Sequence, residues 1–167
     1  FYEFDRGQIL IDGQDIKDYS QEALRKSIGL VLQEPFLYHG TIASNIRMYH
    51  EELTDEEIRQ AAAFVDVADF IESLPGGYDH PVTERGSTLS TGQRQLLAFA
   101  RTIAAQPKIL ILDEATANID QETEEMIQNS LKKMRQGRTT IAIAHRLSTI
   151  QDADCIYVLD KGKIIES

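Results

Sequence analysis

Two adjacent carboxylates, Asp113 and Glu114, follow a short apolar run and are the first candidates for chemistry in this sequence. The run, residues 109–112, is entirely apolar, which is typical of a parallel strand buried on both faces. Open α/β sheets bind their ligands at the carboxyl ends of such strands. We therefore interpret the pair as a ligand-binding strand end, although a solvated strand end is the simpler interpretation of an isolated Asp-Glu pair.

A helix predicted over residues 90–104 begins with a second chemical feature. Ser90 is a good N-cap residue and Gln93 stands three positions later, which is the pattern of a capping box. Gly92 in the first turn lowers helix propensity and leaves backbone N–H groups open to an anion. A helix start with a hydroxyl and a bare glycine suits a phosphate; a helix that is only well capped is the alternative.

The same features belong to a series of motifs that closely resembles the nucleotide-binding domain of ATP-binding-cassette (ABC) transporters. The series is Gln33 after the run IGLVL, LSTGQ at 89–93, ILILDE at 109–114, ANID at 117–120 and His145 after TIAIA. In family terms these resemble the Q-loop, the signature, Walker B, the D-loop and the switch histidine. Each motif is weak alone, but five in the family's order over nearly the whole chain are specific.

The resemblance implies an α/β fold of the P-loop NTPase class, RecA-like, in which helices flank a mostly parallel sheet. Residues 1–40 would form the core β-region with the Q-loop, 41–100 an inserted helical subdomain with the signature, and 101–167 the catalytic core. In the helical part, TDEE at 54–57 predicts a capping box. The helix that follows is expected to bury a stripe of Ile58, Ala61, Ala62 and Val65.

ATP hydrolysis with Mg²⁺ is the chemistry that the resemblance implies. Asp113 would hold Mg²⁺ through water, and Gln33 would be a further Mg²⁺ ligand that senses the γ-phosphate. Glu114 would be the base or orient the attacking water, and His145 would donate to the γ-phosphate and hold that water. Without the resemblance, Gln33 would be read as a polar residue that follows a strand, and His145 would be read as an ordinary surface or core histidine.

In the family, the signature of one domain closes on ATP held by a second domain, so two domains sandwich two nucleotides head to tail. The implied ATP-binding residues are Gln33, Leu89, Ser90, Thr91, Gly92, Gln93 and Asp120. Asp120 would cross the interface and couple the two sites. Thr91 replaces a residue that is usually small, often glycine, and ANID departs from the commoner SALD-like D-loop, which leaves the role of Asn118 open.

The P-loop motif G-x-x-x-x-G-K-[ST] occurs nowhere in the sequence. In the family its amides and lysine hold the β- and γ-phosphates. The chain opens with FYEFDRG, which resembles a family segment downstream of that loop. We therefore expect the chain to correspond to the C-terminal two-thirds of such a domain, lacking its first strands and Walker A, and to bind Mg-ATP poorly and remain inactive when isolated.

Composition limits the class of protein further. The 167 residues are 42% hydrophobic, enough for one domain core, and no apolar run approaches the roughly 18 residues of a membrane span. A net charge of −10 argues against a nucleic-acid partner, because such surfaces need clustered lysine and arginine. The single cysteine, Cys155, lies in a strand-like run and is expected to be a small buried thiol.

Two segments resemble those through which exporters contact their membrane domain. Residues 36–46 resemble the segment that receives intracellular helices, so Phe36, Leu37 and Tyr38 are candidates for exposed apolar contacts; ordinary packing of a loop aromatic is the alternative. Residues 83–86 (TERG) resemble the loop before the signature that marks exporters. The implied partner is a transmembrane domain fused N-terminally, and the implied location is the cytoplasmic face of the cell membrane.

The function that we expect is ATP binding and hydrolysis that power export of a substrate across a membrane. An ABC-type ATPase of DNA repair or chromosome maintenance is an alternative. Those relatives insert long coiled coils between the Q-loop and the signature, whereas this chain has only residues 34–88 there. A non-catalytic truncated interaction module is the third hypothesis.

Overall fold

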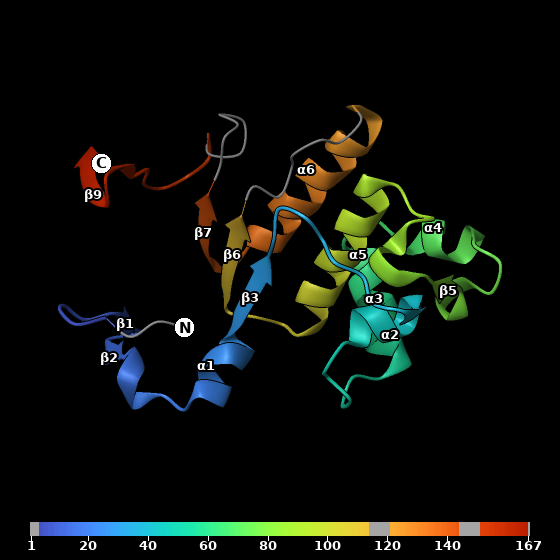
Figure 1. Ribbon diagram of the computed structural model, residues 1–167, viewed down its shortest axis with the longest axis horizontal. Coiled ribbons are helices and arrows are strands. Elements are labelled where there is room, and N and C mark those ends of the chain that lie inside the picture. Colours follow the sequence, from blue (N-terminus) through green and yellow to red (C-terminus); the bar gives the residue numbers. More distant parts are fainter. Residues whose placement is uncertain (1–3, 114–120, 144–150, 167) are drawn as a thin grey trace.

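A parallel sheet forms the centre of the chain. The computed structural model describes residues 4–113, 121–143 and 151–166, with only the helical backbone of 121 and 122. The sheet has three strands, in the order β3 (Ile28–Val31), β6 (Ile109–Asp113) and β7 (Thr139–Ile143) (Figure 1). Val31 pairs with Leu112, and Asp113 pairs with Ile143, so the carboxyl ends of all three strands lie at one edge. The predicted parallel α/β sheet is therefore confirmed.

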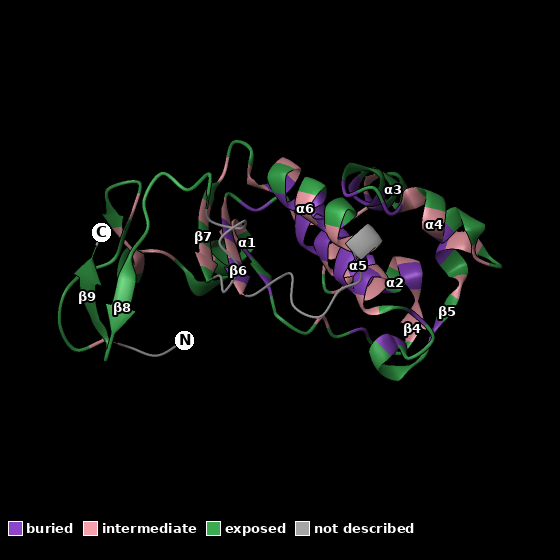
Figure 2. Cartoon of the chain, turned by 90° about the horizontal axis from the view of Figure 1, so that it is seen from above, coloured by how far each residue is buried: buried purple, intermediate pink, exposed green. Residues whose placement is uncertain are grey.

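Two helices cover one face of this sheet. Helices α5 (Thr91–Ala104) and α6 (Gln121–Arg135) pack against each other, and α5 also packs against β3 (Figures 1 and 2). Gly29 of β3 permits the close approach, because an added Cβ would lie 2.7 Å from carbon atoms of Thr102 and Pro107. The face of α5 that packs in this way is apolar, and its buried residues include Leu96, Leu97, Ala100, Ile103 and Ala104.

The second face of the sheet differs from the sequence prediction. Residues 109–112 are predicted to be buried on both faces, yet only Leu110 and Leu112 are buried, and Ile111 is half-buried. Leu30 and Ile141, the register partners of Ile111, are 51% and 56% exposed. The reason is that α5 and α6 are on one side, and within the described ranges no helix covers the other.

A block of helices lies between β3 and β6. It contains α2 (Ile42–Arg47), α3 (Asp55–Phe64), α4 (Ala68–Ser73) and then α5, with a short pairing of β4 (Gly40–Thr41) and β5 (Pro81–Val82) and 3₁₀ turns η2 (Gly77–Asp79) and η3 (Glu84–Gly86). The predicted buried stripe of Ile58, Ala61, Ala62 and Val65 is confirmed. None of the helices in the described part of the chain combines the length and apolar character needed to cross a membrane.

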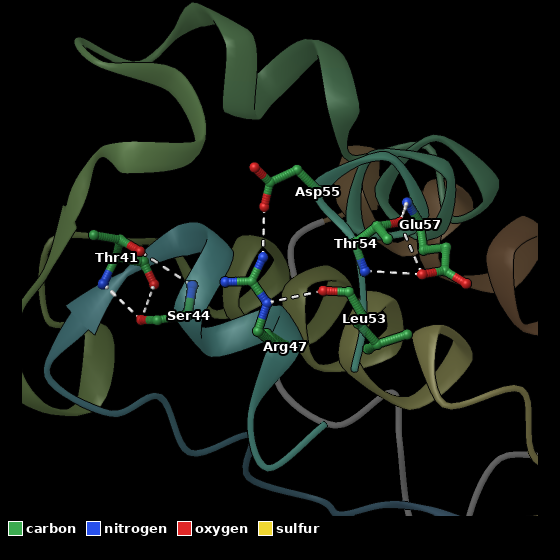
Figure 3. A network of polar contacts seen from close by, with 7 residues as sticks. All are labelled: Thr41, Ser44, Arg47, Leu53, Thr54, Asp55 and Glu57. Atoms are coloured by element: carbon green, nitrogen blue, oxygen red, sulfur yellow. Dashed lines mark hydrogen bonds and ion pairs between the residues drawn. The ribbon is translucent and has the colours of Figure 1, made fainter. Parts of the chain in front are cut away.

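Reciprocal side-chain caps begin α2 and α3, as Figure 3 shows. At α3, the predicted box is confirmed: Glu57 accepts from the Thr54 N–H at 2.8 Å, and the Thr54 hydroxyl accepts from the Glu57 N–H at 3.3 Å. Arg47, at the end of α2, donates to the Leu53 carbonyl at 3.2 Å and pairs with Asp55. These bonds fix the connection between the two helices.

Hairpins flank the sheet at both ends of the chain. β1 (Leu10–Ile11) and β2 (Gln14–Asp15) join through an Asp-Gly turn, and η1 (Ile16–Asp18) leads to α1 (Gln21–Ser27), which is capped by Ser20. β8 (Val158–Asp160) and β9 (Lys163–Glu166) form the C-terminal hairpin. The prediction for Cys155 is wrong: the thiol is exposed, because Cys155 lies in the segment that leads into this hairpin, outside the core that α5 and α6 build (Figure 2).

A buried arginine ties α5 to the start of the helical block. Arg101 donates to the carbonyl of Asn45 at 2.7 Å, to the side-chain oxygen of Asn45 at 3.2 Å and to the carbonyl of Phe36 at 3.0 Å. Asn45, which is 2% exposed, also accepts from the Tyr38 N–H and donates to the Tyr38 and Thr41 carbonyls. No carboxylate of the described residues forms an ion pair with Arg101, and burial lowers its pKa.

The substitution Asn45→Ala tests this tie. It removes an acceptor from a buried guanidinium and from the Tyr38 N–H, so we expect the free energy of unfolding to fall by about 3 kcal/mol. Asn129→Ala on the exposed face of α6 is the matched control and should change it by at most about 0.5 kcal/mol. Urea unfolding measures both. Equal effects of the two substitutions would contradict the network.

The Glu57 cap makes a prediction for acid pH. The Thr54 N–H, and then its hydroxyl, hold the pKa of the Glu57 carboxyl below its ordinary value. The resulting stabilisation is present above the unfolded pKa of about 4.3 and is lost as the pH falls through the lowered folded pKa. In an NMR titration, Thr54→Ala should move this pKa upward, whereas Thr88→Ala should leave it in place. An unchanged pKa in Thr54→Ala would rule out the hydroxyl contribution.

Candidate functional site

The start of α5 has the predicted capping box and is our candidate phosphate site. The Ser90 hydroxyl accepts from the Gln93 N–H at 3.1 Å, and the Gln93 side chain accepts from the Ser90 N–H at 2.9 Å, which confirms the capping box. None of the described residues accepts a hydrogen bond from the amides of Thr91 or Gly92. Two N–H groups without an acceptor in the described part of the chain, at the positive end of a 14-residue helix, favour an anion there.

Arg94 shapes this helix start, and sequence reasoning missed it. Its guanidinium donates to the Leu89 carbonyl at 2.6 Å and to the Thr91 hydroxyl at 3.0 Å, with a longer contact of 3.5 Å to the Gly86 carbonyl. An arginine in the first turns of a helix usually indicates an exposed cation, so the sequence carries no signal for these backbone partners. Leu89 is itself buried, which anchors the residue just before the N-cap.

The segment that precedes the signature contacts the segment that follows Gln33. The Arg85 N–H donates to the Leu37 carbonyl at 3.0 Å, and β5 pairs with β4. Gly86 lies so close that an added Cβ would be 2.9 Å from the Leu37 side chain. The two segments that resemble exporter contact sites, residues 36–46 and 83–86, therefore share one surface.

Exposure within this surface corrects one prediction. Phe36 and Tyr38 are 42% and 44% exposed, and their rings meet edge to face with centroids 4.8 Å apart. Leu37, also predicted as an exposed candidate, is fully buried. The alternation of an extended segment explains the difference, because successive side chains point to opposite sides.

Asp113 is the described member of the predicted catalytic pair. It ends β6 and is half-buried, in register with Ile143 of β7. Glu114, Asp120 and His145 lie outside the described residues. Gln33 is exposed two residues after the end of β3, whose last residue pairs with Leu112. The sheet therefore brings Gln33 and Asp113 to the same edge.

These residues fit a nucleotide with its metal ion. An amide oxygen at Gln33 and a carboxylate at Asp113 are ligands that suit Mg²⁺, and water completes such shells. No group of three or more His, Cys, Asp or Glu side chains within the described ranges could hold a metal by itself. Because α5 leads directly into β6, the start of α5 lies toward the same end of the molecule as the strand ends, to one side of them (Figure 1).

Proteins similar to this chain are ABC transporters. A putative ABC transporter ATP-binding protein of Streptococcus pneumoniae serotype 4, exp8, is 75% identical over 100% of the chain. A probable multidrug resistance ABC transporter ATP-binding/permease protein of Bacillus subtilis, YheH, is 54% identical over 99% of it. The chain spans 28% and 25% of the lengths of these relatives.

A solved structure confirms the predicted fold class. A bacterial Atm1-family ABC exporter with ATP bound matches 99% of the chain, which covers 29% of that structure's chain, with a TM-score of 0.88 and 46% identity. The similar proteins include exporters and ATP-binding/permease proteins, so the DNA-repair alternative is not favoured. The sequence profile of the ABC transporter family matches residues 1–117, and this membership implies nucleotide binding. The chain belongs to the ABC transporter family.

Proposed function

We propose that this chain is part of the ATP-hydrolysing domain of an exporter, in which ATP binding and hydrolysis drive transport across a membrane. The observation that carries the proposal is the capped start of α5, where the amides of Thr91 and Gly92 lack acceptors among the described residues. An ATP-bound exporter of the same fold supports it. The three segments of the domain are 1–40, 41–100 and 101–167, as the resemblance implies.

The edge of the sheet is where we place hydrolysis. Asp113 and Gln33 would hold Mg²⁺, which supplies charge neutralisation of the phosphates when bound. Glu114, next in sequence to Asp113, would orient water or take its proton. His145, two residues after Ile143, would donate to the γ-phosphate. Parallel pairing of β6 and β7 supports this assignment, because both strands end at the same edge.

The signature would act on a nucleotide held by a second domain. Ser90, Gly92 and their neighbours Leu89, Thr91 and Gln93 would present N–H and hydroxyl donors to its phosphates, in a head-to-tail dimer. Asp120 would lie at the dimer interface. The start of α5 lies to one side of the strand ends (Figure 1). This position supports the proposal, because one chain then offers two separate half-sites, the signature and the carboxyl edge of the sheet.

The surface formed by residues 36–46 and 83–86 would receive the membrane domain. Phe36 and Tyr38 expose apolar rings there, and Glu84 is exposed in the neighbouring turn. YheH is described as an ATP-binding/permease protein, which supports a transmembrane partner in the same polypeptide. Such a domain would lie at the cytoplasmic face of the membrane.

Replacing Glu114 tests the proposal in the full-length protein. Glu114→Gln should reduce ATP turnover by at least about 10²-fold while ATP stays bound, because the amide cannot take a proton from water. Glu125→Gln, an exposed position on α6, is the matched control and should turn over normally. Phosphate release and retained radiolabelled nucleotide measure the two effects. Normal turnover in Glu114→Gln would remove this residue from the catalytic role.

A further inference from the structure

The start of α6 packs directly on the signature glycine. Gly92 is buried, and a Cβ added to it would overlap the methyl group of Thr123 and lie 3.0 Å from the Thr123 Cβ and 3.4 Å from its hydroxyl. Thr123 is the third residue of α6, and α6 lies alongside α5 in both views (Figures 1 and 2). A real side chain at position 92 would therefore displace one helix from the other.

The contact with Thr123 requires glycine at position 92. In a helix the N–H groups point along the axis toward the N-terminus, whereas the Cα–Cβ bond points away from the axis with a tilt toward the N-terminus. The Gly92 amide has no acceptor among the described residues, and the place of the missing side chain is filled by Thr123. Any residue except proline would supply the amide, so the packing on Thr123 is what excludes a side chain at position 92.

Further along, α6 is fixed to the helical block. The Ser130 hydroxyl, fully buried, donates to the Val65 carbonyl at 2.9 Å, and Lys133 pairs with Asp66 at 2.6 Å. Val65 and Asp66 form the corner between α3 and α4. Contacts along α6, from its first turn to its last, therefore reach the same block that carries the signature. Of these contact residues, Thr123 stands closest in sequence to residues 117–120, which precede α6.

We infer that Thr123 is a positioning residue: its methyl group, seated on Gly92, sets where α6 begins relative to the signature of the same chain. This inference rests on the proposed function, in which the signature binds a phosphate and Asp120 lies at the interface between domains. A phosphate drawn to the start of α5 then acts on α6 by direct packing, and α6 follows residues 117–120 in sequence. The contact of the Thr123 methyl with Gly92 would link the signature to the start of α6.

Double substitutions in the full-length protein test the packing. Gly92→Ala should lower the thermal midpoint by about 2–8 °C, because the added methyl overlaps that of Thr123. Thr123→Ala and Thr123→Ser each remove the Thr123 methyl. When either is combined with Gly92→Ala, most of the lost thermal midpoint should be recovered. Thr123→Val keeps the methyl and loses only the hydroxyl, so it should recover nothing. The inference is overturned if Gly92→Ala does not lower the thermal midpoint. It is also overturned if Gly92→Ala lowers it equally with threonine, alanine, serine or valine at position 123.

Kinetics test the positioning role itself. Thr123→Ser keeps the hydroxyl and removes the methyl. We expect its kcat for ATP hydrolysis to be at least about fivefold lower and its KM to be unchanged. The reason is that the signature would lose its alignment but keep its contacts with the nucleotide. An unchanged kcat, or a raised KM alone, overturns the role. The thermal measurements need no ATP turnover, so they test the contact even if the proposed function fails; wild-type protein without ATPase activity would mark that separate failure.

Discussion

Helix α5 is buried along most of its length between the helical block, α6 and the sheet, and each of these contacts fixes one part of the site. Its start carries two amides without acceptors among the described residues, and its last turn packs on β3 at Gly29 and leads toward the strand that Asp113 terminates. Arg101 adds a polar tie from the same helix to Phe36 and Asn45. A shift of α5 would therefore disturb both proposed half-sites, the signature and the carboxyl edge of the sheet.

The polar contacts of α5 follow a common rule. Arg94 and Arg101 both place a guanidinium against backbone carbonyl groups, and no carboxylate of the described residues pairs with either. A fork of N–H donors can satisfy several carbonyls at loop ends, which lysine cannot do with the same geometry. These two arginines therefore hold loops in place without using any of the described acidic side chains that contribute to the chain's net charge of −10.

Local features of the fold could be predicted from the sequence, and distant ones could not. The capping boxes at Thr54 and Ser90 depend on residues three positions apart, so short patterns indicate them. Arg101 reaches carbonyls 56 and 65 residues away, and no local pattern indicates such partners. The same limit applies to Cys155 and to the open face of the sheet, because burial depends on which elements pack nearby. The contact of Thr123 with Gly92 was likewise beyond prediction, since helix spacing alone does not show which residues meet.

Hydrogen exchange at the start of α5 tests the central claim most directly. In the full-length Glu114→Gln protein, mass spectrometry would follow the peptide that contains the amides of Thr91 and Gly92, with and without Mg-ATP. If these unpaired amides bind a phosphate, their exchange slows when ATP is bound, while a peptide from the exposed β8–β9 hairpin is unchanged. Exchange that stays equally fast while the protein retains ATP would contradict the account.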